Sequence, residues 1–376
     1  MTDTPHLWLR AECKPFEKRT ALAPTICKEL LDQGFKITVE KSPERIFDDS
    51  EYAALGLPLV EAGSWTSAPA DAYIVALKEL PDATTPLTHR HIMFGHCFKG
   101  QDGSAELLRR FQAGHGTLLD LEFLQDDRGT RVAAFGYYAG YAGAAMGLEA
   151  WAYRQLHGAA GTKALAHPKV DPFPNEQALI AHVKQLLAEA EQKTGMAPSL
   201  FVMGALGRCG RGACDFATAV GLPETAITRW DINETKKGGP FPEICDRAVF
   251  VNCIYLTQKI APFLTFAELE AAGPNRSLSI LVDVSCDPNN PNNPIPVYKE
   301  YSFFDQPVNY LPVNAAGCAD LGVIAIDHLP TLLPREASES YGRQLLPTLI
   351  DLRSFGPVWK RAEQKFRDVT QAVLKA

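Results

Sequence analysis

The chain has 376 residues, a formal net charge of −7 and 46% apolar residues. This length exceeds one ordinary hydrophobic core and predicts two domains. The acidic balance argues against nucleic-acid binding, which needs a basic face. No run approaches the roughly 18 apolar residues of a membrane span. The nine cysteines include no Cys-x-x-Cys pair, which argues against a disulfide scaffold and a zinc site. We therefore expect a cytoplasmic protein that binds neither nucleic acid nor membrane.

Strand-like and helix-like segments alternate along the chain, which is typical of an α/β fold with parallel sheets. In the first part, the pattern predicts strands at 7–9, 35–40, 71–77 and 91–95, a helix from Pro24, and a helix at 104–112 capped by Ser104. After a loop at 158–175, it predicts a helix that ends at Gly195 and strands at 199–203, 226–230, 248–252 and 279–283. A polar Asn/Pro loop at 287–296 and a final helix at 358–373 complete the pattern.

The segment 132–147 consists almost entirely of small and aromatic residues. Small residues allow helices or backbones to approach closely. We therefore expect tight packing here, at a junction between domains.

A glycine-rich turn, Gly204-x-x-Gly207-x-x-Gly210, follows one buried strand and precedes a helix. Such a turn lets the backbone approach a pyrophosphate, which the helix N-terminus also favours. A second strand ends at Asp231, whose carboxylate could accept hydrogen bonds from ribose hydroxyls and would repel a 2′-phosphate. The combination predicts NAD rather than NADP. The alternative is a structural packing turn in a fold that binds nothing.

Lys78 and His96 follow the ends of two predicted parallel strands, where ligands bind in open α/β sheets. A lysine that is desolvated or close to another cation has a lowered pKa and can act as a base near neutral pH. Glu79 and Glu122 could tune such a base. The alternative is that Lys78 is a surface lysine in a turn before Pro81.

Arg19 and Arg131 are candidate carboxylate ligands, because guanidinium binds carboxylate through two parallel hydrogen bonds. The alternative is that both are solvated surface residues.

Potential metal ligands gather around the strand at 91–95, namely His89, His91, His96 and Cys97. They straddle a buried strand without a regular ligand spacing, so we expect no metal site. Cys209 and Cys253 could lie close together at neighbouring strand ends, where two free thiols are the expected state in the cytoplasm.

Ordered blocks span nearly the whole chain: 9–12 (LRAE), 19–24 (RTALAP), 77–81 (LKELP), 94–99 (FGHCFK), 131–136 (RVAAFG), 204–210 (GALGRCG), 230–232 (WDI), 251–256 (VNCIYL), 326–330 (IDHLP) and 333–338 (LPREAS). Together they resemble the NAD-dependent, lysine-forming saccharopine dehydrogenases of the alanine dehydrogenase/transhydrogenase-like superfamily.

The resemblance implies two Rossmann-like domains with parallel sheets and an interdomain cleft. Residues 1–135 plus 330–376 would bind substrate, and residues 136–329 would bind the dinucleotide. The implied reaction is the reversible oxidative deamination of saccharopine to L-lysine and 2-oxoglutarate, the last step of lysine biosynthesis through aminoadipate. The family is usually monomeric. An alanine dehydrogenase-like enzyme and a non-catalytic NAD-binding sensor remain alternatives.

The family's site residues transfer to matching positions of this chain. Lys78 would be the base for the secondary amine, His96 the acid–base group for imine hydrolysis, and Glu79 and Glu122 would adjust their pKa values. Substrate contacts would come from Arg19, Lys78, Arg131, Phe135, Ser285, Cys286 and Asp287. NAD contacts would come from Gly204, Gly207, Arg208, Asp231, Thr235, Tyr255, Val284, Ile326, Asp327, His328 and Leu329.

Two of these positions bear on how closely the chain follows the family. Cys209 and Cys253 match a pair that can be disulfide-linked in the family. Cys286 stands where we expect alanine, a small difference.

Overall fold

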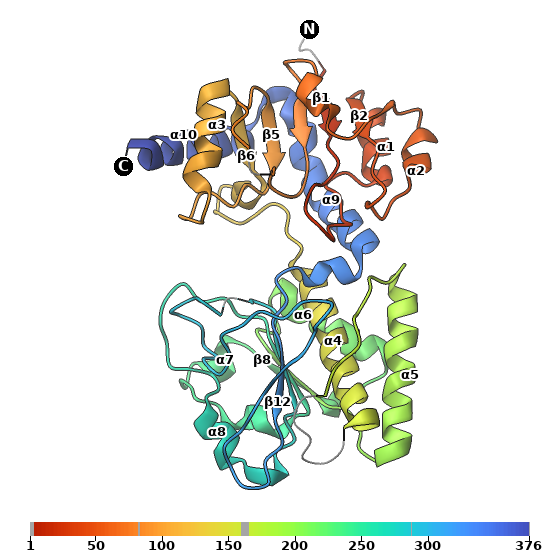
Figure 1. Ribbon diagram of the computed structural model, residues 1–376, viewed down its shortest axis with the longest axis vertical. Coiled ribbons are helices and arrows are strands. Elements are labelled where there is room, and N and C mark those ends of the chain that lie inside the picture. The colour runs from red at the N-terminus through yellow and green to blue at the C-terminus, as the bar shows by residue number, and fades with distance from the viewer. Residues whose placement is uncertain (1–3, 82, 159–164, 287, 376) are drawn as a thin grey trace. The chain divides into compact units, whose positions relative to one another are not determined.

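The computed structural model describes residues 4–81, 83–158, 165–286 and 288–375. It divides into two compact units (Figure 1): Met1–Phe135 with Pro334–Ala376, and Gly136–Leu333. Residues 330–333, which we expected in the first unit, belong to the second because Leu332 and Leu333 pack in its hydrophobic core. The expected cleft between the domains stays a prediction.

The first unit is built on a six-stranded sheet in which every pair of neighbouring strands is parallel. In the order β3-β2-β1-β4-β5-β6, the strands are β3 (Leu59–Val60), β2 (Lys36–Glu40), β1 (His6–Leu9), β4 (Tyr73–Val75), β5 (Arg90–Met93) and β6 (Thr117–Asp120). The central strands β1 and β4 are buried along their whole length, as expected for a parallel sheet covered on both faces.

The helices of the first unit come from both ends of its sequence. They are α1 (Pro24–Asp32), α2 (Asp49–Ala53), α3 (Ser104–Gly114), α9 (Pro334–Ile350) and α10 (Pro357–Lys375), with 3-10 turns η1 (Ser64–Ser67), η2 (Leu121–Phe123) and η7 (Asp351–Ser354). α1 starts with proline, which suits the first helical position. α9 packs on α1 so closely that a Cβ on Gly342 would lie 2.6 Å from Ile26 Cγ1.

The cap predicted for α3 is wrong. Ser104 is the first residue of the helix, and the preceding Gly103 occupies the cap position with φ 77°. Glycine tolerates this left-handed conformation without strain, which explains why it precedes the helix.

The second unit contains another six-stranded sheet, in the order β11-β12-β10-β9-β7-β8. Its strands are β11 (Asn309–Leu311), β12 (Leu321–Ile324), β10 (Ile280–Asp283), β9 (Val249–Asn252), β7 (Leu200–Met203) and β8 (Ile227–Trp230). Only the edge strand β11 runs antiparallel to its neighbour. The helices are α4 (Gly136–His157), α5 (Glu176–Thr194), α6 (Arg208–Ala219), α7 (Ile232–Thr235) and α8 (Phe266–Ala271), with 3-10 turns η3 (Glu224–Ala226), η4 (Pro242–Asp246), η5 (Gly273–Asn275) and η6 (Leu329–Leu332). Among the described residues of both units, no helix is long and apolar enough to cross a membrane.

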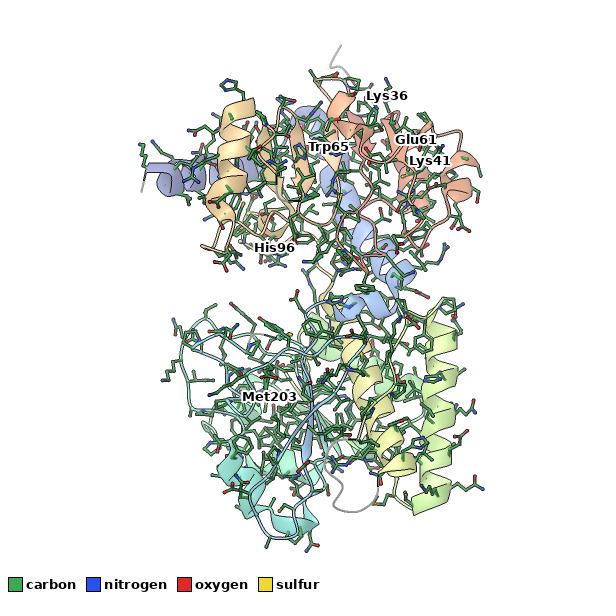
Figure 2. All side chains as sticks on the ribbon, in the orientation of Figure 1. Lys36, Lys41, Glu61, Trp65, His96 and Met203 are labelled. Carbon is green, nitrogen blue, oxygen red and sulfur yellow. The ribbon has the colours of Figure 1, made fainter. Side chains whose placement is uncertain are left out.

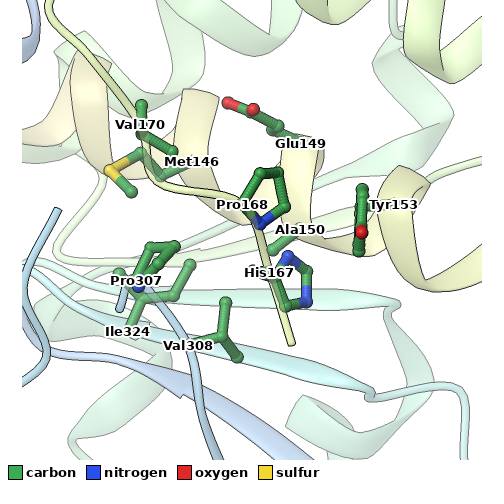
Figure 3. Close-up of a pocket in the computed structure, with 10 residues that line it drawn as sticks. All are labelled: Met146, Glu149, Ala150, Tyr153, His167, Pro168, Val170, Pro307, Val308 and Ile324. Carbon is green, nitrogen blue, oxygen red and sulfur yellow. The ribbon is translucent and has the colours of Figure 1, made fainter. Parts of the chain in front are cut away.

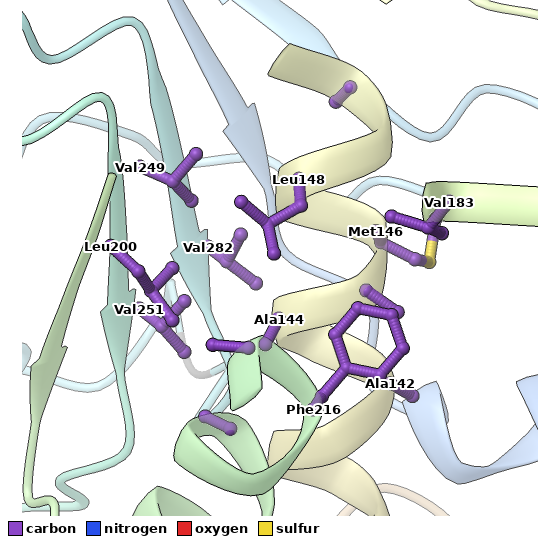
Figure 4. Close-up of a cluster of buried hydrophobic side chains, with 14 of the residues drawn as sticks. Ala142, Ala144, Met146, Leu148, Val183, Leu200, Phe216, Val249, Val251 and Val282 are labelled. Carbon is purple, nitrogen blue, oxygen red and sulfur yellow. The ribbon is translucent and has the colours of Figure 1, made fainter. Parts of the chain in front are cut away.

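The close packing expected near 132–147 is confirmed as a contact between α4 and α6. A Cβ on Gly140 would lie 1.8 Å from the carbonyl oxygen of Cys209, and a Cβ on Gly212 would lie 2.0 Å from that of Tyr137. The rest of α4 packs its small and apolar side chains on the sheet (Figure 4). This contact fixes the start of α6, which directly follows the glycine-rich turn.

The two parallel sheets determine where the candidate residues lie. Chain segments that follow parallel strands emerge at one edge of the sheet, where ligands bind in this class of fold. Lys78 and His96 follow β4 and β5 of the first sheet, whereas Gly204, Asp231 and Val284 follow β7, β8 and β10 of the second.

Candidate active site

His96 and Glu79 lie side by side at the carboxyl edge of the first sheet (Figure 2 labels His96). The His96 Nε2 atom is 3.8 Å from Glu79 Oε2. Burial lowers the pKa of His96, the charge of Lys78 lowers it further, and the Glu79 carboxylate acts in the opposite direction. Lys78 therefore lies close enough for its charge to act on the imidazole. The structure brings together the three residues that the sequence placed at neighbouring strand ends.

Both candidate tuning carboxylates have cationic partners. Glu79 Oε1 accepts a hydrogen bond of 3.0 Å from Lys14 Nζ. Glu122 Oε1 accepts from Lys99 Nζ at 2.7 Å and from Arg131 Nη2 at 2.9 Å. Burial alone would raise the pKa of each carboxyl group, but these hydrogen bonds and charges outweigh it and lower both pKa values. The two glutamates are therefore ionised at neutral pH.

A buried carboxylate, Asp120, ties the ends of β5 and β6 together. Its Oδ2 accepts from the Gly95 amide at 3.1 Å and its Oδ1 from the Glu122 amide at 2.9 Å. Burial raises the pKa of Asp120 to about 6. The sequence analysis did not identify this residue, which holds the backbone beside both His96 and Glu122.

Arg19 is not the solvated surface residue of the alternative interpretation, because it is only 4% exposed. Its Nε and Nη2 donate to the two carboxylate oxygens of Glu17 at 2.8 and 2.7 Å. Its guanidinium also lies 4.5 Å above the ring of Phe135, which stacks on Tyr341 at 4.3 Å. A substrate carboxylate would therefore meet an arginine that is already oriented by a carboxylate and an aromatic ring.

A hollow of about 660 Å³ opens at His96 and Glu79 in the first unit. Glu79 and His96 line it together with Gly95, Gln101, Ser104 and Arg110, among others. Its volume falls within the usual range of small-molecule sites.

In the second unit, the glycine-rich turn has the geometry that a bound pyrophosphate requires. Gly204 has φ 85°, and a Cβ on Gly210 would lie 2.1 Å from the carbonyl oxygen of Gly204. Gly207 occupies the cap position of α6, and Arg208 begins the helix with its side chain exposed. Met203, labelled in Figure 2, ends the buried strand before the turn. The turn thus presents backbone and a helix N-terminus without side-chain obstruction, which fits a dinucleotide phosphate.

Asp231 connects the end of β8 to this turn. Its side chain accepts hydrogen bonds from the Leu206 amide at 2.9 Å and the Ile232 amide at 2.8 Å. The side chains of Leu206 and Ile232 are 71% and 70% exposed, an unusual exposure for large apolar residues. Exposed apolar side chains of this kind fit the flat face of an adenine. The sequence analysis missed both residues, although their positions beside Gly207 and Asp231 are the available signal.

The remaining NAD candidates lie at the same edge of the second sheet but differ in exposure. The Thr235 hydroxyl donates to the carbonyl of Asp231 at 2.9 Å, and Tyr255 is 57% exposed. In the 326–329 segment, Ile326 and Leu329 pack in the hydrophobic core, whereas Asp327 is exposed and His328 half-buried.

A network of hydrogen bonds around Asp283 fixes the start of the polar loop after β10. Asp283 is fully buried, and its Oδ1 accepts from the Ser285 hydroxyl at 2.6 Å and from Asn252 Nδ2 at 3.0 Å. Its Oδ2 accepts from the Tyr298 hydroxyl at 2.5 Å. Cys286, buried next to Ser285, has φ 48°, a conformation that non-glycine residues rarely adopt. Asp287, the third substrate candidate of this loop, lies outside the described residues.

Cys209 and Cys253, the disulfide candidates, are both free thiols. A hydrogen bond to Cys209, together with burial, raises the pKa of the Cys253 thiol well above its usual value. The disulfide implied by the resemblance is therefore not present, and the expectation from the residues themselves, two neighbouring free thiols, is confirmed.

Neither His91 nor the small pocket of the second unit belongs to the candidate active site. Among the described residues, no three His, Cys, Asp or Glu side chains are placed to hold a metal ion. His91 packs against Trp65 and Phe111 instead, and burial lowers its pKa to about 3. A small pocket of the second unit (Figure 3), lined by His167 and Tyr153 among others, has about 10 Å³, room for one water molecule.

Comparisons with known proteins agree with this geometry. The family described as "Alanine dehydrogenase/PNT, N-terminal domain" matches residues 8–142. A solved structure of L-alanine dehydrogenase has the same fold, with a TM-score of 0.64 over 98% of this chain and 99% of that chain, at 14% identity.

Full-length relatives are much more similar in sequence. The saccharopine dehydrogenase [NAD(+), L-lysine-forming] of Yarrowia lipolytica is 53% identical over 97% of this chain and 98% of its own length. The enzyme of the same name from Schizosaccharomyces pombe is 51% identical over 98% of this chain and 99% of its own length. This identity over the whole chain shows that the protein belongs to the family of NAD⁺-dependent, L-lysine-forming saccharopine dehydrogenases.

Proposed function

We propose that the protein catalyses the reversible, NAD-dependent oxidative deamination of saccharopine to L-lysine and 2-oxoglutarate. The observation that supports this best is the grouping of Lys78, His96 and Glu79 at one sheet edge, where the lysine's charge acts on the imidazole. A proton acceptor beside an acid–base histidine is what an amine oxidation followed by imine hydrolysis needs. The reaction would complete lysine biosynthesis through aminoadipate.

Lys78 would remove the proton from the secondary amine of saccharopine. Oxidation at the glutarate α-carbon then gives an imine, for which NAD, when bound, supplies the hydride acceptor. Lys78 must be neutral to act as the base. His96, whose pKa is lowered by burial, stays available as a neutral imidazole for the later hydrolysis.

His96 would serve the hydrolysis of the imine. As a neutral imidazole it can take a proton from water as that water adds to the imine carbon. The resulting imidazolium can return this proton to the nitrogen, which gives the carbinolamine. The imidazole can then carry the hydroxyl proton of the carbinolamine to the nitrogen as the C–N bond breaks, which releases lysine and 2-oxoglutarate. Glu79, 3.8 Å from His96, stabilises the protonated form during this exchange.

Arg19 and Arg131 would bind carboxylates of saccharopine, which has three. The Nε and Nη2 atoms of Arg19 are held by Glu17 and its guanidinium is stacked on Phe135, so the guanidinium is oriented before substrate arrives. Such preorganisation reduces the entropy that substrate binding must overcome. Ser285 and Cys286 would add contacts from the loop after β10.

The second unit would bind NAD. The turn Gly204–Gly210 would hold the pyrophosphate, Asp231 the adenosine ribose, and Leu206 and Ile232 would cover the adenine. Arg208, Thr235, Tyr255, Val284 and the 326–329 segment complete this assignment.

The two alternatives fit less well. Against alanine dehydrogenase, the chain is about half identical to full-length saccharopine dehydrogenases, while its 14% identity to the L-alanine dehydrogenase structure supports the fold alone. A non-catalytic NAD sensor would have no need to keep Lys78, His96, Arg19 and Arg131 together in the first unit.

We also propose that the enzyme acts as a monomer in the cytoplasm on small molecules alone. The acidic net charge of −7 and the free thiols favour this assignment. Light scattering after size exclusion should give a mass near the 41.1 kDa of one chain.

A spectrophotometric assay tests the reaction. Purified protein should consume NADH with lysine plus 2-oxoglutarate and should be inactive with pyruvate plus ammonia. Lys78→Met should lower kcat about 100-fold or more, the scale of a lost general base. Activity with pyruvate plus ammonia, but not with lysine plus 2-oxoglutarate, would favour the alanine dehydrogenase alternative. Unchanged turnover of a folded Lys78→Met variant would show that Lys78 is not the base.

A further inference from the structure

Two buried charged residues that follow β1 face the chain that follows β4. Arg10 is 1% exposed, and the Glu12 side chain is 8% exposed. Their own charged groups are 3.9 Å apart, at the limit of an ion pair. Burying both charges is expensive unless each finds good hydrogen-bond partners. Their partners are therefore informative about what the pair does.

Those partners include the backbone groups of Lys78 and its neighbour, besides the Ala11 carbonyl and Cys13 Sγ, to which Arg10 Nη1 donates at 3.0 and 3.1 Å. Glu12 Oε1 accepts from the Leu77 amide at 2.6 Å, and Oε2 accepts from the Lys78 amide at 2.9 Å. Arg10 Nη2 donates to the Lys78 carbonyl at 2.6 Å. The amide and the carbonyl of Lys78 are thus both held by side chains of the neighbouring strand's extension.

These side-chain hydrogen bonds take the place of backbone pairing beyond the point where the ladder between β1 and β4 ends. The last backbone bond of that ladder runs from the Arg10 amide to the Val75 carbonyl at 2.9 Å. On the other side, the chain still pairs with β5, since the Phe94 amide donates to the Leu77 carbonyl at 2.8 Å. The segment at Lys78 is therefore held from both neighbouring strands, by backbone on one side and by buried charges on the other.

The contacts of Arg10 and Glu12 form a clamp on the backbone of Lys78. Arg45 forms a similar clamp elsewhere in the sheet, where its role is structural only. Arg45, 8% exposed, donates through Nη2 to the Glu40 carbonyl at 3.0 Å and to Asp49 Oδ1 at 2.8 Å. It secures the end of β2, where no candidate catalytic residue lies. Both arginines thus bind a strand-end carbonyl beside a carboxylate, and only the clamp of Arg10 and Glu12 includes Lys78.

We propose that Arg10 and Glu12 are positioning residues that fix the backbone of Lys78 and thereby aim its side-chain nitrogen at the substrate amine and at His96. The catalytic part of this inference rests on the proposed function, because it takes Lys78 as the base. A displacement of a reacting group by about 1 Å can cost about 100-fold in rate, so a clamp on the backbone has a direct kinetic consequence.

Matched variants separate positioning from stability. Arg10→Lys and Arg45→Lys each keep the charge and lose the fork that reaches a strand-end carbonyl, so both should lower the melting temperature. Only Arg10→Lys should lower kcat, by about 10-fold or more, and shift the acidic limb of the kcat/KM pH profile for saccharopine oxidation. Glu12→Gln is a second variant, because its amide can accept only one of the two backbone N–H groups and turns a donor toward the other.

The pKa of His96, followed by NMR and assigned with His96→Gln, gives a readout that needs no turnover. The charge of Lys78 lowers this pKa, so loss of that charge in Lys78→Met should raise it and set the full scale. Arg10→Lys should raise it by part of that amount, and Arg45→Lys should leave it unchanged.

Equal kinetic and titration effects in both arginine variants, or an unchanged His96 titration and pH profile in Arg10→Lys and Glu12→Gln, would overturn the inference. If the wild-type protein fails to convert lysine and 2-oxoglutarate while the His96 pKa responds to Arg10→Lys and not to Arg45→Lys, the clamp stands and the proposed function fails.

Discussion

Replacing Gly210 with alanine tests whether the glycine-rich turn holds the cofactor. The new Cβ would lie 2.1 Å from the Gly204 carbonyl oxygen and 2.5 Å from Ala205 Cα. Ordinary contacts begin near 3.4 Å, so the first distance must grow by about 1.3 Å (3.4 − 2.1). Both neighbours are backbone atoms, and no flexible side chain can yield. The turn itself must therefore move away from the start of α6.

The expected loss in NADH affinity follows from that displacement. Each charge-assisted hydrogen bond from a backbone amide to the pyrophosphate contributes about 1.5–3 kcal/mol. Losing one such bond raises the Kd for NADH about 10- to 100-fold, because each 1.4 kcal/mol is a factor of ten. Overpacking also costs about 1–3 kcal/mol of stability.

Isothermal titration calorimetry with NADH measures this loss directly. Gly322→Ala, in β12, is the matched control. Its new Cβ would lie 2.7 Å from Ile280 Cδ1, which is the end of a side chain and can move. It should reduce stability and leave the Kd for NADH within about twofold. A folded Gly210→Ala protein that binds NADH as tightly as the wild type would refute the placement of the pyrophosphate on this turn.

Three further predictions concern the buried carboxylates and His96. The pKa of Asp120 is about 6 in the folded protein, above the ordinary 3.8. Asp120 therefore contributes to the free energy of unfolding at low pH, and this contribution is lost as pH rises from about 4 through 6. Urea unfolding should therefore show a decline of up to about 3 kcal/mol over this window that is missing in Asp120→Asn; parallel pH curves would contradict the assignment. Glu79→Gln should lower the pKa of His96 further, since the carboxylate now raises it, and an NMR titration that moves upward would exclude their electrostatic contact. Tyr298→Phe leaves one oxygen of buried Asp283 without its 2.5 Å donor and should cost about 2 kcal/mol of stability, more than Tyr310→Phe; an equal or smaller loss would show that the network matters little.

Part of the fold could be read directly from the sequence because local and tertiary preferences agree there. The strand before Gly204, the turn and α6 combine an apolar run, glycines with special geometry and a regular helix start, and all lie where the pattern predicts them. α9 was not anticipated, because it contains Pro347, which normally interrupts a helix, and its buried face depends on packing against α1. β12 was also missed, since its four residues include Gly322 and its pairing with β10 and β11 is what makes it a strand.

The candidate site shows the same division. Lys78 and His96 could be placed near each other because parallel strands end at a common edge. The partners that orient them could not, because the contacts of Arg10, Glu12 and Asp120 join segments distant in sequence through backbone groups. Sequence alone gives no sign of which carbonyl or amide a charged side chain will meet.

The discontinuous composition of the first unit has a consequence for biosynthesis. Tyr341 and Leu345 of α9 are fully buried in the core formed with residues near the other end of the chain. On the ribosome, the early strands must wait without this cover until the entire Gly136–Leu333 segment has been translated. The second unit, one uninterrupted stretch, can fold as it emerges, and the nascent first unit will be the part most in need of chaperones.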